Sequence, residues 1–153
     1  MAGGNILTPY ADNLSGCITL LLAMEQLAAD QPGSLPNDVY FVFSVQEEVG
    51  LRGARVAAHW IDPYMSVAVD VCSTGDSPES DEKMVVKLGE GPAIKLKDQS
   101  VICNPQTVQH LRQAAESSGI PYQDEILTAG GTDAGAIQRD VYKRQRYRAP
   151  ACR

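Results

Sequence analysis

The chain has few cysteines, little positive charge and no long apolar segment. Its four cysteines, Cys17, Cys72, Cys103 and Cys152, are widely spaced without a Cys-x-x-Cys pair, so neither a zinc knuckle nor a disulfide framework is indicated. No apolar run approaches the ~20 residues of a membrane-spanning helix, and the N-terminus does not have the basic-then-apolar layout of a signal peptide. We therefore expect a cytoplasmic protein with no membrane partner.

The charge balance excludes another class of partner. Lys and Arg number 13 against 19 Asp and Glu, which gives a net charge of −6. This balance argues against a nucleic-acid binder, which needs positive charge to contact phosphates. Hydrophobic residues make up 44% and charged residues 21%, close to the globular average, so intrinsic disorder is excluded as the main state.

Helical and strand-like segments alternate along the chain. Helices are predicted over residues 14–29, 50–60 and 104–118, the last capped by Asn104 and ended by Gly119, with a further helix from Thr132. Strands are predicted over residues 39–45, 65–71, 84–88 and 122–127, of which the first two read as buried on both faces. The helix over residues 14–29 presents an apolar face to pack on a sheet. This alternation predicts a layered α/β fold.

Residues 139–153 do not continue this pattern. They are basic and aperiodic, and they follow a helix that we expect to end at Gln138. The string DVYKRQ, residues 140–145, is also the translation of GATGTGTATAAGAGACAG, the end of a widely used transposon sequencing adapter. We expect residues 1–138 to form one partial catalytic domain and residues 139–153 to be a non-native tail. A natural basic tail is the alternative.

Carboxylates stand at three points where predicted strands end or a helix begins: Asp12, the pair Glu47 and Glu48, and Asp70. Proteins of the α/β class place ligands at such ends. Structural roles compete with this interpretation, because Asp12 suits a helix cap and the glutamate pair suits a helix N-terminus. Asp70 lies among apolar neighbours, where a carboxylate is costly to bury unless it is paired or binds a cation. Together the three points favour a two-metal hydrolase with one glutamate free to act as a base.

Longer motifs resemble the tetrahedral (TET) metallo-aminopeptidases, a family also described as glutamyl, leucyl or deblocking aminopeptidases and labelled endoglucanase M. The resemblance covers residues 8–138. The matching stretches are residues 10–13 (YADN), 43–54 (FSVQEEVGLRGA), 68–71 (AVDV), 75–78 (GDSP), 89–94 (GEGPAI), 120–123 (IPYQ) and 130–134 (GGTDA).

The resemblance implies a three-layer α/β/α zinc-peptidase-like catalytic domain that is incomplete here, with its first strands and an inserted dimerisation domain absent. It implies that Asp12 bridges two divalent metal ions, zinc or cobalt, that Glu48 binds one and that Asp70 binds the other. Glu47 matches the general base that takes the proton from the attacking water. Thr132 and Asp133 match a substrate-side or supportive loop, although a helix N-cap suits Asp133 equally well.

Both histidine ligands of the family are missing from the matching positions. One belongs far upstream of Asp12, and the other belongs about twenty residues beyond the GGTDA motif. His59 and His110, the two histidines of the chain, fall within predicted helices and match neither ligand. Each metal would keep two carboxylates, fewer than the three protein ligands of a catalytic zinc site, so we expect this chain to be inactive.

For the parent protein the resemblance implies removal of N-terminal residues from peptides and a homo-oligomer of the dodecamer type. Two alternatives stay open. A glycoside hydrolase also uses paired carboxylates, but Glu47 and Glu48 are adjacent and do not readily flank a sugar bond. A non-catalytic α/β module, whose acids only cap helices, is the other alternative.

Overall fold

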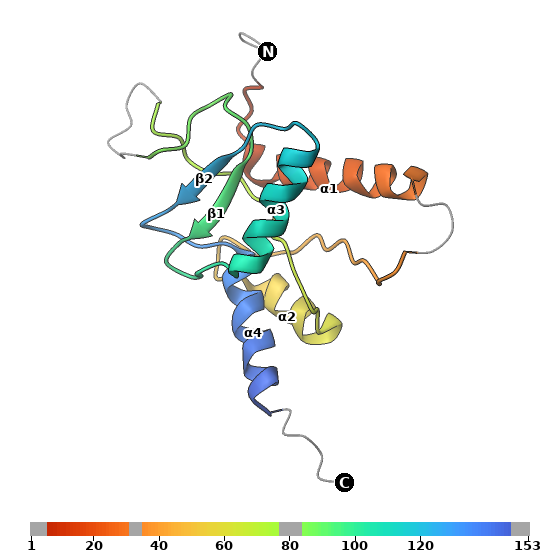
Figure 1. Cartoon of the computed structure of the whole chain (residues 1–153). Helices are drawn as coiled ribbons and strands as arrows, with labels where there is room; N and C mark the ends of the chain where they lie inside the picture. The colour runs from red at the N-terminus through yellow and green to blue at the C-terminus, as the bar shows by residue number, and fades with distance from the viewer. Residues whose placement is uncertain (1–5, 31–34, 77–83, 148–153) are drawn as a thin grey trace.

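The computed structural model describes residues 6–30, 35–76 and 84–147 of the chain. Its elements in chain order are α1 (Ala11–Asp30), α2 (Arg52–Ile61), β1 (Ala93–Lys97), α3 (Pro105–Ser117), β2 (Gln123–Ile126) and α4 (Asp133–Tyr147) (Figure 1). The strands β1 and β2 pair in parallel, and α3 connects them and packs against β1. A third contact between elements, separate from this unit, joins α2 to α4. The arrangement is part of an α/β domain, as the sequence predicts.

The α3 helix confirms the predicted start and stop signals. The Asn104 side chain accepts a hydrogen bond from the Gln106 N–H at 2.8 Å, and Pro105 occupies the first helical position, where its missing N–H costs nothing. At the other end, Gly119 takes a positive φ of 64°, which ends the helix before Ile120.

The predicted end of the last helix at Gln138 is wrong. The α4 helix continues through Tyr147 as one element. The residues after Gln138 contain neither glycine nor proline before Tyr147, and arginine, lysine and glutamine are good helix formers. The helix therefore continues although the apolar periodicity of the sequence is lost after Gln138.

Three of the four predicted strands are wrong. Among the described residues, segments 39–45, 65–71 and 84–88 form no ladder, and only the predicted strand over residues 122–127 is present, as β2. The predicted double-sided burial of the first two segments is also wrong, since Val39, Val45 and Val67 are about half exposed or more. Apolar, β-branched sequence favours extended backbone, but a strand exists only where a neighbour supplies hydrogen-bond partners.

Segment 84–88 shows what replaces a ladder when no strand lies alongside. The Gln123 side chain accepts from the Lys87 N–H at 2.9 Å and donates to the Lys87 carbonyl at 3.0 Å. It also lies 3.0 Å from the Gly91 carbonyl, to which its amide donates. One side-chain amide from β2 thus satisfies both polar groups of the Lys87 backbone, and the segment is held beside β2 without becoming a third strand.

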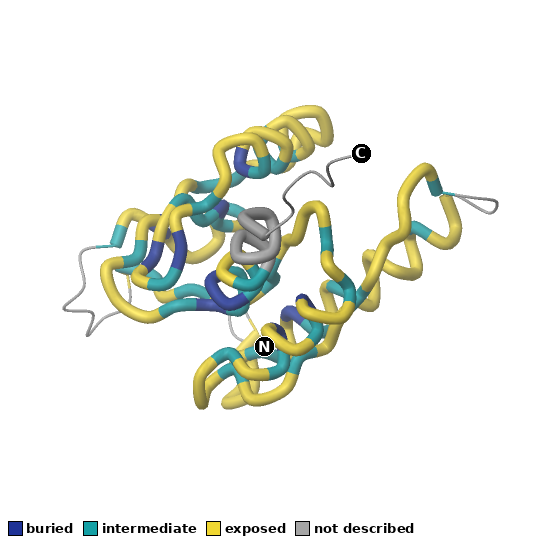
Figure 2. Tube along the Cα trace, turned by 90° about the horizontal axis from the view of Figure 1, so that it is seen from below, coloured by how far each residue is buried: buried dark blue, intermediate teal, exposed yellow. Residues whose placement is uncertain are grey.

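The chain is open, and much apolar surface faces solvent. Its accessible surface is 11930 Å², whereas a compact monomer of 16.5 kDa exposes about 7,500 Å². Figure 2 shows buried residues only in a few short stretches of the trace. The expectation that α1 packs its apolar face on a sheet is wrong for the described part of the chain. Residues exposed on that helix include Leu14, Ile18, Leu21 and Leu22.

A cluster of one lysine and two buried acids joins the two strands. Lys95 of β1 is paired in register with Glu125 of β2, and its Nζ lies 3.2 Å from the Glu125 carboxylate and 3.5 Å from that of Asp98. Both acids are 2% exposed. Burial acts to raise the pKa of Asp98, but hydrogen bonds from Ser100 and the Val101 N–H, together with Lys95, bring it below its ordinary value.

Loss of this cation is expected to destabilise the fold strongly. Lys95→Met keeps the aliphatic stem but leaves two buried carboxylates without their cation, which costs about 3–5 kcal/mol. Arg112→Met is the matched control, because the Arg112–Asp124 pair is 2.6 Å long but more exposed and is worth about 0–1 kcal/mol. Urea unfolding of both variants measures the difference. Equal midpoints would contradict a special role for Lys95.

Candidate metal and catalytic site

A tight turn before α2 presents Glu47 and Glu48. The carbonyl of Glu47 accepts hydrogen bonds from the N–H groups of Gly50 and Leu51 at 3.1 and 2.9 Å, and that of Val45 accepts from Gly53 at 2.9 Å. A Cβ at Gly53 would lie 2.5 Å from the Val45 backbone. The glycine therefore lets the start of α2 close on the segment that carries both glutamates.

Asp12 and Asp70 lie beside a long-range hydrogen bond. The Asn13 side chain donates to the Val69 carbonyl at 2.8 Å and accepts from the Gly16 N–H at 3.0 Å. The bond that caps α1 thus comes from Asn13, and the competing interpretation of Asp12 as the cap has no hydrogen bond to support it in the described residues. Asp70 is exposed at the surface, although its carboxylate is partly shielded from water.

The GGTDA segment reaches the same region through Asp133. Ser44, three residues before Glu47, donates a hydrogen bond from its hydroxyl to the Asp133 carboxylate. The other carboxylate oxygen of Asp133 is buried and has no hydrogen-bond partner in the described structure. Thr132 is 7% exposed, which makes it a core residue at this point.

The pKa of Glu47 reflects partial burial and negatively charged surroundings. Its pKa is raised by burial first, and then by the negative charges of Asp70, Asp133, Glu48 and Asp12. The pKa of Asp70 is also raised, again mainly by burial, with Asp12 and Asp133 adding to the shift and the Val71 N–H and Lys95 opposing it. Carboxylates from three other parts of the chain, together with the neighbouring Glu48, therefore contribute to the electrostatic environment of Glu47.

The carboxylates suit a divalent cation chemically but do not form a complete cage. A cation bound between carboxylates relieves their mutual repulsion. The buried Asp133 oxygen that has no hydrogen-bond partner would also be stabilised by a positive charge. Nevertheless, no three His, Cys, Asp or Glu side chains of the described residues lie close enough to hold a metal ion. His59 on α2 and His110 on α3 are both exposed and belong to no such group.

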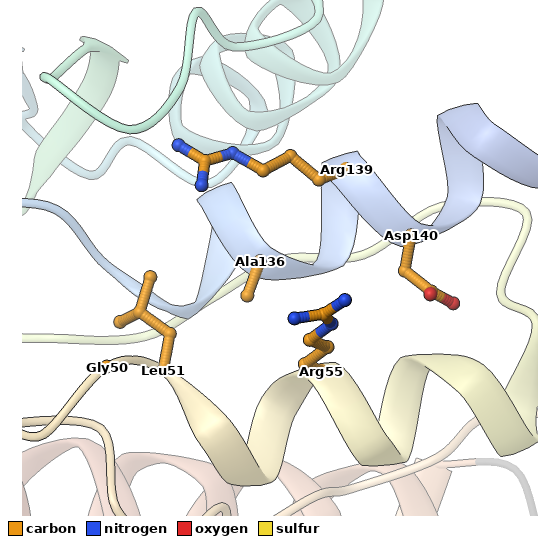
Figure 3. Close-up of a pocket in the computed structure, with 6 residues that line it drawn as sticks. All are labelled: Gly50, Leu51, Arg55, Ala136, Arg139 and Asp140. Atoms are coloured by element: carbon orange, nitrogen blue, oxygen red, sulfur yellow. The ribbon is translucent and has the colours of Figure 1, made fainter.

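A separate cavity of about 190 Å³ lies between α2 and α4 (Figure 3). In Figure 3, Arg55 extends from α2 toward α4, and Asp140 extends from α4 toward α2. None of the predicted site residues lines this cavity, and its volume is below the ~300 Å³ at which ligand pockets usually begin. We therefore do not assign the substrate to it.

The chain matches a known protein family over most of its length. The family profile described as M42 glutamyl aminopeptidase matches residues 1–145 of the chain. The chain belongs to this family. A putative aminopeptidase of Acetivibrio thermocellus is 50% identical over 137 residues, a match that covers 90% of this chain and 40% of the relative. A lysyl aminopeptidase of Pyrococcus furiosus is 41% identical over 132 residues, which is 86% of this chain and 36% of that protein.

Solved structures agree with the M42 assignment. A TET aminopeptidase of a marine-sediment Thaumarchaeota archaeon matches with a TM-score of 0.77 at 36% identity, over 84% of this chain and 36% of that one. The TET1 peptidase of Pyrococcus horikoshii, which can assemble into a tetrahedron or a large octahedral shell, matches with a TM-score of 0.69 at 37% identity, over 84% of this chain and 37% of that one. This M42 chain spans about two fifths of the length of these relatives. Among its described residues, no helix has the length and hydrophobicity needed to cross a bilayer.

Sequence reasoning missed three residues that organise the site. Asn13 and Ser44 lie inside the matched motifs but carry no charge, so they were not singled out. Lys95 lies in β1, a strand that was not predicted, although the alternation of apolar and charged residues in AIKLK (Ala93–Lys97) is a strand signal.

The raised pKa of Glu47 predicts a stability gain on neutralising it. The folded, metal-free chain holds the Glu47 proton more tightly than the unfolded chain, so stability falls as pH rises from the ordinary glutamate range through the raised pKa. We expect Glu47→Gln to raise the Tm of the metal-free protein at pH 7 by about 1–4 °C. The gain should vanish at pH 3.5, where both states are protonated.

Glu25→Gln, at an exposed position on α1, is the matched control and should leave the Tm unchanged at both pH values. Thermal unfolding followed by circular dichroism measures both variants. A Glu47→Gln variant that melts at or below the control at pH 7 would contradict the electrostatic account.

Proposed function

We propose that this M42 chain is part of a metal-dependent aminopeptidase that hydrolyses N-terminal residues from peptides. The observation that carries the proposal is the environment of Glu47. Burial raises its pKa most, and four other carboxylates, each at a position implied by the family motifs, raise it further. A cluster of this kind is costly without a cation and supplies both ligands and a base with one.

Asp12, Glu48 and Asp70 are the residues that would hold two divalent ions, zinc or cobalt, with Asp12 between them. Bound ions polarise a peptide carbonyl and lower the pKa of water. Glu47 takes the proton of the attacking water and delivers it to the leaving amine. Thr132 and Asp133 support this arrangement from the start of α4, with the Asp133 carboxylate tied to Ser44.

The names of relatives support two coarser points. Relatives are described as lysyl and glutamyl aminopeptidases, which supports peptides, rather than glucans, as the substrate class that we propose for the whole protein. The glycoside hydrolase alternative is therefore not favoured. Structures of related TET1 peptidases include a dodecamer, and we extend a homo-oligomer of this type to the whole protein.

The non-catalytic module remains the competing function, because caps and turns account for some acids. Burial would raise the pKa of a structural glutamate as well, but caps and turns give no reason for four further carboxylates whose charges add to the shift at Glu47.

We also propose that residues 139–153 are a translated adapter and not native sequence. The basis is the DVYKRQ string at residues 140–145. Coding DNA without GATGTGTATAAGAGACAG at this position would refute it.

The 153-residue chain is expected to show no aminopeptidase turnover with added Zn²⁺ or Co²⁺. Its carboxylates leave each ion short of the three protein ligands of a catalytic zinc site, and neither histidine joins them. Assay against aminoacyl-p-nitroanilides with acidic, aliphatic and basic residues tests this. Robust turnover that EDTA abolishes would show that the histidines are dispensable.

In the whole protein, Glu47→Gln is expected to lower kcat by about 100- to 10,000-fold, the usual contribution of a general base. Metal content should stay at the wild-type level, because Glu47 is not a ligand in this scheme. Kinetics and elemental analysis on the same preparation measure both quantities. An active Glu47→Gln enzyme would remove the base role and favour the non-catalytic module.

A further inference from the structure

The Asn13 side chain makes two hydrogen bonds, one within the start of α1 and one to a distant segment of the chain. Its Oδ1 accepts from the Gly16 N–H at 3.0 Å, three residues ahead at the start of α1. Its Nδ2 donates to the Val69 carbonyl at 2.8 Å, from the segment that carries Asp70. The side chain is partly buried, so both bonds are partly shielded from water.

The first bond alone does not require asparagine. A cap needs only an acceptor, and serine serves there about as well as asparagine. The second bond requires a donor on the same side chain at amide length. Asparagine supplies both, because its carbonyl accepts while its NH₂ donates.

Gly16 is shaped around this amide. A Cβ at residue 16 would lie 2.3 Å from Oδ1 of Asn13 and 2.9 Å from both Cγ and Nδ2. All three atoms belong to the one side chain that reaches Val69. The buried glycine therefore leaves the space in which the amide sits.

The hydrogen bond from Asn13 to Val69 lies next to two of the proposed metal ligands. Asp12 precedes Asn13 directly, and Asp70 follows Val69 directly. The hydrogen bond thus joins the peptide after one carboxylate to the peptide before the other, across 56 positions of sequence. Residues 12 and 13 have non-helical φ and ψ angles although they open α1, so regular helix geometry does not hold Asp12 in place.

We propose that Asn13 is a positioning residue of the metal site, which fixes Asp12 relative to Asp70 through its bond to Val69, and that Gly16 makes room for it. The inference rests on the proposed function in taking both carboxylates as metal ligands. Groups that orient ligands in this way typically change metal affinity by 10- to 100-fold when they are removed.

The test uses Asn13→Ser in the whole protein, with Asn104→Ser as the matched control. Serine can cap α1 but is too short to reach Val69, so the variant removes one bond. Asn104 caps α3 through its Oδ1, which accepts a hydrogen bond from the Gln106 N–H at 2.8 Å, so the same substitution there leaves the proposed metal site untouched. Gly16→Ala is a second route, because it displaces the amide without changing Asn13.

Metal-free protein is titrated with Co²⁺, and its visible absorption gives affinity and stoichiometry. We expect Asn13→Ser and Gly16→Ala to bind Co²⁺ at least 10-fold more weakly than the wild type, while Asn104→Ser binds normally. In thermal unfolding of metal-free samples, the Tm of Asn13→Ser should be close to that of Asn104→Ser. A loss of metal affinity at equal Tm then reflects positioning of the ligands rather than loss of stability.

Wild-type affinity in Asn13→Ser would overturn the proposal and leave the proposed function intact. A wild-type protein that takes up no Co²⁺ would refute the proposed function itself, and this inference with it. Gly16→Ala decides the matter if Asn13→Ser does not fold, since normal Co²⁺ affinity in that variant would equally overturn the proposal.

Discussion

The ion pairs of Lys95 with Glu125 and Asp98 connect β1, β2 and the loop that follows β1. Lys95 and Glu125 join the two parallel strands, and Asp98 turns the chain after β1 into the loop that carries Ser100. Ser100 contacts the backbone at Gly131 and Gly135 so closely that neither position has space for a Cβ. The start of α4, and with it Asp133, is therefore located by a network that begins at the ammonium group of Lys95 between two buried acids.

The same cation stands opposite the acid cluster. Burial raises the pKa of Asp70 most, Asp12 and Asp133 raise it further, and Lys95 lowers it. Negative charge predominates around Glu47, where four other carboxylates contribute. Repulsion between these carboxylates destabilises the metal-free fold and favours the binding of divalent cations. Glu47 therefore lowers the stability of the metal-free fold while serving the proposed activity.

Sequence patterns predicted the parts of the fold that depend on neighbours along the chain. The cap at Asn104, the stop at Gly119 and the start of α4 after the glycine pair are local events, settled by backbone geometry and one or two hydrogen bonds. The strands over residues 39–45 and 65–71 depend on partners elsewhere. Their apolar composition indicated burial, but the described residues supply neither a ladder nor a covering surface.

The sequence by itself determined the family and the residue types of the site, because the carboxylates lie in motifs that are specific as strings. Tertiary structure alone decided which uncharged groups hold them: the amide of Asn13 on Val69, the hydroxyl of Ser44 on Asp133, and the ammonium of Lys95 between two buried acids. These contacts join residues far apart in the chain. A pattern of local spacing contains no information on such distances, whereas hydrogen bonds and ion pairs depend on them directly.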